Sequence, residues 1–161
     1  MSTTTRPTTA EPITPELSAR LIADVRKTWP ELTDELGARG VQQMAAYLGT
    51  VAHSTEPLTP SLRVDLFWHA FILRTAPYTV FCKSIGVDYI HHVPEDNESG
   101  TDPEKGRAAL TRTTDAIRAA GYDVDAEFWP GEDAADCTET PFVEASDCTQ
   151  CHAGCHNSPK K

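Results

Sequence analysis

The stretch SLRVDLFWHAFILR occupies residues 61–74 and predicts the most apolar helix of the chain. Thr59-Pro60-Ser61 supplies the hydroxyl and proline residues that typically stand at the start of a helix. Apolar side chains then cover nearly the whole circumference of a helix over residues 62–74. Since a helix that is apolar all round is normally enclosed by others, we expect it to be buried on every side.

Other helices are predicted on both sides of this core helix. Thr14-Pro15-Glu16 and Asp102-Pro103-Glu104 repeat the combination of a capping residue and a proline in the first turn. Gly37 and Gly40 are expected to separate the second helix from a short preceding turn, and residues 87–93 are expected to be extended. The predicted helices cover residues 14–29, 41–51, 62–74, 78–85 and 103–120.

These elements predict an all-α fold, a compact bundle of about five helices. The 161 residues suffice for one domain with its own apolar core. We expect a disordered head at residues 1–13, a helical domain at residues 14–130, and an acidic linker with a Cys/His-rich tail at residues 131–161.

The formal net charge of −10 limits the classes of partner. Phosphate backbones and anionic membrane surfaces repel such a chain, so neither nucleic acid nor a membrane is an expected partner. The first ten residues contain no apolar run, so we expect no secretion signal. We expect a cytoplasmic protein whose partners are a metal ion and, beyond it, another protein.

Asp65 and His69 are the first candidate site, because they are four residues apart on the apolar helix and share one face. A buried carboxylate needs a partner, and His69 is the nearest one. His91 or His92 is expected to add a second imidazole; adjacent residues of an extended segment face opposite ways, so only one of them can do so. The group fits a metal-dependent or acid–base site, or a structural hydrogen bond that fixes helix packing.

Residues 64–94 also carry a resemblance to a known family. The pattern Val-Asp-x-x-Trp-His begins at Val64, Tyr-x-x-Phe-Cys begins at Tyr78, and His-x-Pro ends at Pro94. This combination resembles the glycine-rich domain-containing protein-like family over about residues 17–130. The resemblance implies an all-helical domain and no particular reaction, and it marks as family-type positions Asp65, His69, Cys82, His91 and His92. The glycine-rich tract of that family is absent here.

The tail is the second candidate site, because four of the five cysteines lie in the last 25 residues and are interleaved with histidines. The candidate metal ligands are Cys137, Cys148, Cys151, His152, Cys155 and His156. Mixed sulfur and nitrogen donors favour zinc, with Cu(I) as an alternative, whereas the thiolates alone would suit an iron–sulfur cluster. Cytoplasmic cysteines seldom form lasting disulfides, which favours metal binding or thiol chemistry.

Several interpretations of the tail remain open. Cys148-x-x-Cys151-His152 also fits the attachment pattern of c-type haem, but this would require export, which we do not expect for this chain. The thiols could also be redox-active, modified by a partner enzyme, or simply exposed. Our leading functional prediction is a small zinc-binding accessory protein. Its rival is a metal-dependent enzyme that acts on a small molecule at the core Asp/His/His group.

Overall fold

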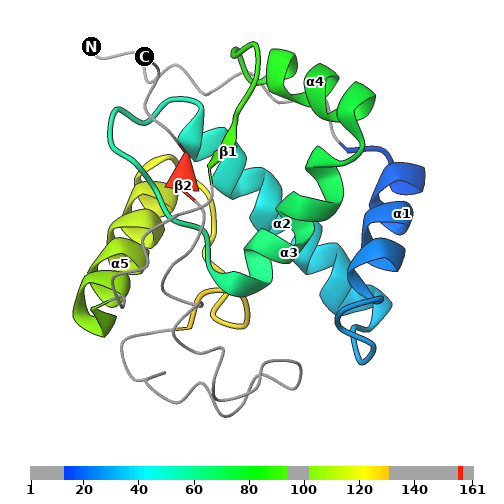
Figure 1. The fold of residues 1–161 in the computed structure, drawn as a ribbon, viewed down its shortest axis with the longest axis horizontal. Coiled ribbons are helices and arrows are strands. Elements are labelled where there is room, and N and C mark those ends of the chain that lie inside the picture. The colour runs from blue at the N-terminus through cyan, green and yellow to red at the C-terminus, as the bar shows by residue number, and fades with distance from the viewer. Residues whose placement is uncertain (1–12, 94–101, 131–155, 158–161) are drawn as a thin grey trace.

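The computed structural model describes residues 13–93, 102–130 and 156–157, which form five helices and two very short strands (Figure 1). The helices are α1 (Pro15–Val25), α2 (Asp34–Val51), α3 (Leu62–Ile72), α4 (Thr75–Ser84) and α5 (Pro103–Ala119). The strands β1 (His92–Val93) and β2 (His156–Asn157) pair antiparallel. The predicted all-α fold with about five helices is confirmed for this part of the chain.

Side-chain caps set the start of four helices. The capping residue accepts a hydrogen bond from a backbone N–H of the first turn at Thr14, Thr33, Ser61 and Asp102. Such a cap stabilises a helix by about 1 kcal/mol, because the first N–H groups have no partner within the helix. The cap at Ser61 matters most for the site, since it starts α3 at Leu62 and so places Asp65 in the first turn.

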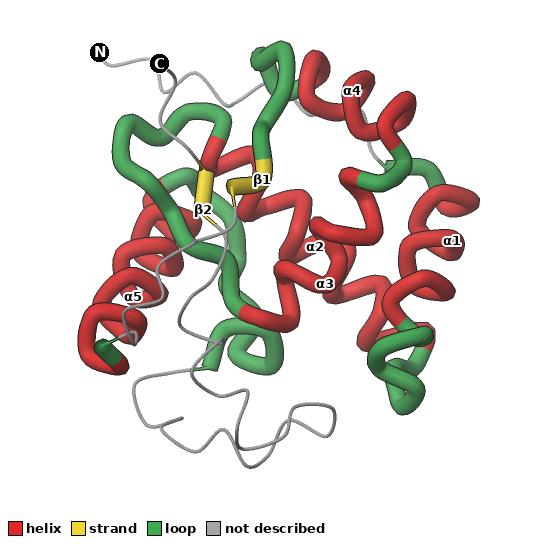
Figure 2. Tube along the Cα trace, in the orientation of Figure 1, coloured by secondary structure: helices red, strands yellow, loops and turns green. Residues whose placement is uncertain are grey.

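The centre of the molecule is formed by α2 and α3, which pack against each other (Figure 1). α1 packs on both of them, α5 packs on α2, and α4 packs on α3, so the helices surround one core (Figure 2). Aromatic side chains dominate this core. The largest fully buried ones are Trp68, Tyr47, Tyr78, Phe67, Phe71 and Phe128.

The start of α2 differs from the prediction. The helix begins at Asp34, and Gly37 and Gly40 lie inside it instead of before it. A Cβ atom on Gly37 would lie 2.7 Å from Cγ2 of Ile22 in α1, and one on Gly40 would overlap the ring of Phe67 in α3. The two glycines therefore let the neighbouring helices approach the α2 backbone, and they do not break the helix.

The core helix is less enclosed than predicted. Val64, Phe67, Trp68 and Phe71 are buried, but Leu73, the residue that follows the last turn of α3, is 82% exposed. α1, α2 and α4 cover only part of the circumference of α3. The part of α3 that no other described helix covers can therefore carry polar side chains at the protein surface.

The ends of α4 and α5 agree with the predicted stops. Gly86 and Gly121 have φ values of +90° and +89°, a left-handed conformation that glycine adopts without steric cost. Pro77 lies in the first turn of α4, which begins at Thr75, earlier than predicted. Of the segment expected to be extended, residues 87–93, only His92 and Val93 form a strand.

Several predictions fall on residues that the structure does not describe. These are residues 1–12 of the head predicted at residues 1–13, and the tail ligands Cys137, Cys148, Cys151, His152 and Cys155. The backbone of His156 is described, because it belongs to β2. Among the described helices, none has the length and apolar character needed to cross a bilayer.

Candidate functional site

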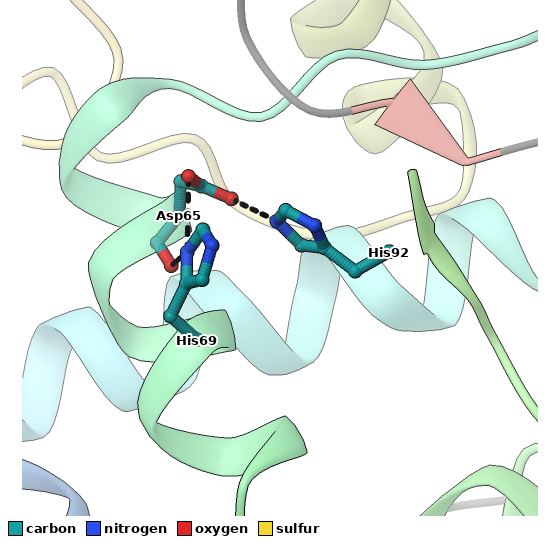
Figure 3. A group of neighbouring side chains, drawn as sticks. All are labelled: Asp65, His69 and His92. Atoms are coloured by element: carbon teal, nitrogen blue, oxygen red, sulfur yellow. Dashed lines mark hydrogen bonds and ion pairs between the residues drawn. The ribbon is translucent and has the colours of Figure 1, made fainter. Parts of the chain in front are cut away.

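α3 carries Asp65 and His69 one turn apart on the same face (Figure 3). Nδ1 of His69 lies 3.1 Å from Oδ2 of Asp65 and 2.9 Å from the Asp65 carbonyl oxygen, which confirms the predicted contact. Asp65 is in the first turn and His69 in the last turn of this short helix. The helix dipole favours a negative charge at the first position and a positive charge at the second.

His92 completes the cluster from a segment 27 residues further along the chain (Figure 3). Its Nε2 atom lies 2.9 Å from Oδ1 of Asp65, so the carboxylate contacts one imidazole with each oxygen. The rings of His92 and His69 have centroids 4.1 Å apart. On its other side the His92 ring packs against Trp68, with centroids 4.5 Å apart.

The cluster has a buried side and an open side. The side chains of Asp65 and His92 are 14% and 10% exposed, whereas that of His69 is 51% exposed. A small ligand can therefore approach from the His69 side without any rearrangement of the core. The Asp65 carboxylate faces both rings at once and is the centre of the group.

Charge and burial shift the pKa values of the cluster in opposite directions. Burial alone would raise the pKa of Asp65, but the hydrogen bonds and positive charges of His69 and His92 outweigh it and bring that pKa below its usual value. The hydrogen bond to Asp65 raises the pKa of His69, against a smaller opposing effect of burial. The resting cluster therefore contains an ionised carboxylate held between two imidazoles.

The cluster has donors suited to a metal ion. One ligand atom from each of Asp65, His69 and His92 lies within 4.8 Å of the other two. Zinc holds nitrogen and oxygen ligands at about 2.0–2.2 Å, so two ligands of a tetrahedral ion are about 3.4 Å apart. The Asp65–His separations of 3.1 and 2.9 Å are those of hydrogen bonds. An ion would replace the shared protons, and the three ligand atoms would adjust their separations towards this value.

The same geometry also satisfies a structural role. Asp65 is paired with two imidazoles, and its contact with His92 ties β1 to α3. The two interpretations differ in what zinc does to the protein. A purely structural cluster would not bind zinc, whereas a metal site would bind it and release protons.

The remaining candidates from the sequence lie elsewhere. His91 is exposed, and its ring packs against Tyr89 with centroids 4.8 Å apart. Only one of the two adjacent histidines thus joins Asp65, as expected from their alternation. Cys82 is buried, and burial raises the pKa of its thiol, so it matches the description of a packed, unreactive cysteine.

Within the described residues, the tail meets the site at the strand pair β1–β2. His92 lies opposite Asn157 and Val93 lies opposite His156 in the antiparallel register. The strand that carries His92 is therefore joined to the Cys/His-rich end of the chain. Sequence reasoning missed this contact, because a two-residue pairing between distant segments has no periodic signal.

The pKa shifts predict how the stability of the metal-free protein depends on pH. The lowered pKa of Asp65 adds stability above about pH 3.9, which is lost as the pH falls through the folded-state value. The raised pKa of His69 adds stability below about pH 6.5, which is lost as the pH rises through the folded-state value. We expect greatest stabilisation by the cluster between about pH 4 and 6.5.

Thermal unfolding between about pH 2 and 9 in the presence of a chelator measures this effect, because this range extends beyond both sides of the window. The difference in melting temperature between the natural protein and Asp65→Asn should be largest in that window and shrink towards both ends. A difference that does not change with pH would contradict the assignment of the charges.

The fold and the cluster define a small all-α protein whose third helix presents an Asp65–His69 pair to a histidine from a distant segment. The chain belongs to the UCP032817-like family, whose model matches residues 12–114, more than half of its length. Comparisons with curated proteins and with solved structures gave no match. The matched residues include Asp65, His69 and His92 and exclude the tail from residue 131 onward.

Proposed function

We propose that this protein binds a divalent transition-metal ion, with zinc as the first choice, through Asp65, His69 and His92. The observation that carries the proposal is the convergence of three ligand groups from two distant segments within 4.8 Å. Partial burial of Asp65 and His92 supports it, because exclusion of water strengthens the attraction between a carboxylate and a cation. The family match covers all three residues.

The donor set narrows the choice of metal. Two imidazoles and one carboxylate suit zinc, and the same set with open positions also suits non-haem Fe(II). Three protein ligands leave at least one position of the ion free, and the exposed His69 places that position within reach of solvent. A metal-dependent enzyme acting on a small molecule is therefore a second candidate, with the metal supplying an activated water.

The Cys/His-rich tail is a further candidate metal ligand set. The pairing of β2 with β1 favours it, because His156 is thereby brought to the strand that carries His92. On this proposal zinc or Cu(I), or an iron–sulfur cluster, is held by tail residues, and the protein is a metal-binding accessory module. Redox exchange or modification of the tail thiols is the remaining alternative.

The family resemblance, the cellular location and the partner of the protein belong to the same proposal. The resemblance of residues 64–94 to the glycine-rich domain-containing protein-like family supports a shared arrangement of the Asp, Trp, His, Tyr and Cys positions. A cytoplasmic location would keep the five cysteines reduced and available to a metal. A protein partner, if the module is an accessory one, would receive or supply the ion.

Metal analysis of the full chain tests the proposal. After zinc loading and desalting, we expect about one Zn²⁺ per chain in the natural protein. We expect the same content in the double variant Cys148→Ser/Cys151→Ser. Substitution with Co²⁺ then reports the ligand type, because thiolate ligands add a strong charge-transfer band that imidazole and carboxylate ligands lack. Protein without bound metal would overturn the proposal, and metal lost in the double variant would move the site to the tail.

A further inference from the structure

We infer that Tyr78 is a positioning residue that holds His92 in the Asp65–His69–His92 cluster. The inference rests on the metal-binding function proposed above, and it names a residue that does not itself contact the cluster. Tyr78 lies on α4 and is completely buried. Its hydroxyl connects α3 to the segment that leads into His92.

Two hydrogen bonds define the role of this hydroxyl. The Trp68 indole N–H donates to the Tyr78 oxygen at 2.9 Å, and the Tyr78 hydroxyl donates to the Ile90 carbonyl at 2.7 Å. A carbonyl can only accept, so the hydroxyl donates to Ile90, and the Cys82 side chain also lies within hydrogen-bonding reach of this hydroxyl. The phenol therefore anchors the backbone two residues before His92.

Trp68 closes the arrangement from the other side. The same indole that donates to Tyr78 packs against the His92 ring at 4.5 Å between centroids. The contacts therefore form a closed loop: Trp68 bonds to Tyr78, Tyr78 bonds to Ile90 just before His92, and His92 packs back on Trp68. Tyr78 fixes the backbone that leads to His92, and Trp68 packs against the His92 ring. Together these two contacts keep Nε2 of His92 directed towards Asp65.

The phenol keeps its proton under all ordinary conditions. Burial raises the pKa of Tyr78 far above that of a free tyrosine. Its hydroxyl can therefore donate to Ile90 across the whole pH range in which metal binding is measured. Support of a ligand by a fixed hydrogen bond outside the metal's own ligands typically changes metal affinity about 10–100-fold.

Tyr47 provides a matched control for this role. Its hydroxyl also donates to a backbone carbonyl, that of Leu58, at 3.0 Å, and the residue is also completely buried. Removal of the Tyr47 hydroxyl deletes an equivalent buried hydrogen bond that does not lead to His92. A merely structural tyrosine would behave alike at both positions.

The experiment compares Tyr78→Phe with Tyr47→Phe in the full chain by two measurements. Side-chain ¹⁵N shifts of the histidines in metal-free protein report the contact of His92 with Asp65, and a chelator competition measures the affinity for Zn²⁺. We expect Tyr78→Phe to shift the His92 signals and to weaken Zn²⁺ binding about 10–100-fold, and Tyr47→Phe to change neither.

Two results would overturn the inference: unchanged His92 signals in Tyr78→Phe, or equal changes in both variants. Failure of the proposed function gives a different result. In that case the natural protein binds no Zn²⁺, while the histidine shifts of the metal-free variants still test whether Tyr78 positions His92.

Discussion

We expect the affinity for zinc to fall at least about 100-fold when Asp65 is replaced by asparagine, a larger loss than that expected for residues behind the ligands. Asp65 contacts both histidines and carries the negative charge of the cluster. Asparagine has nearly the same size as aspartate but no charge. The variant therefore offers a doubly charged ion only neutral imidazole ligands. Chelator competition at pH 7.5, where free imidazoles are mostly neutral, measures the change.

Two controls make this prediction specific. Asp88→Asn removes an equal charge from an exposed position a few residues before His92 and should leave the affinity unchanged. His91→Ala and His92→Ala form a pair of neighbouring variants, of which only His92→Ala should lose zinc, because His91 packs on Tyr89. Equal affinities in this pair, or an unaltered affinity in Asp65→Asn, would exclude the cluster as the metal site.

Replacement of Trp68 by alanine should lower the free energy of unfolding by about 3–5 kcal/mol, the range seen when a large aromatic is removed from a core. Trp68 is completely buried and packs edge-on against Tyr47 at 5.5 Å between centroids. Its loss also removes the donor to Tyr78 and the surface on which His92 rests. Urea unfolding followed by circular dichroism measures the effect.

Leu73→Ala is the matched control, because Leu73 follows the same helix and is 82% exposed. We expect it to change the free energy of unfolding by no more than about 0.5 kcal/mol. Trp68→Phe keeps an aromatic ring but lacks the indole N–H. Its loss of unfolding free energy should therefore lie between those of Leu73→Ala and Trp68→Ala, and the variant should remain folded. A cost below about 1 kcal/mol for Trp68→Ala would show that the core does not depend on this residue.

Much of the fold was predictable, because its helices begin at strong local signals. Thr14 and Asp102 act as caps where the sequence placed them, and Ser61, the last residue of the predicted Thr59-Pro60-Ser61 start, caps α3. The role of Gly37 and Gly40 was not predictable, since a glycine that ends a helix and one that admits a neighbouring helix look alike in one sequence. The difference lies in Ile22 and Phe67, which only the packing brings together.

The site was predictable where its spacing is local. Asp65 and His69 are four residues apart, so their contact follows from helical geometry. The choice of His92 over His91 depends on the fold of residues 87–93, which the alternation rule left open. The role of Tyr78 was missed, because its partner Ile90 offers only a backbone carbonyl, which leaves no trace in the side-chain pattern.

The antiparallel pairing of β1 with β2 has a practical consequence for purification. A polyhistidine tag attached after Lys161 would begin only a few residues beyond Asn157, which lies opposite His92. Its imidazoles would add nickel or zinc ligands to the chain and would raise the metal content measured for the protein. Recombinant material for metal work should therefore be untagged at the carboxyl end, or be released from its tag before the first titration.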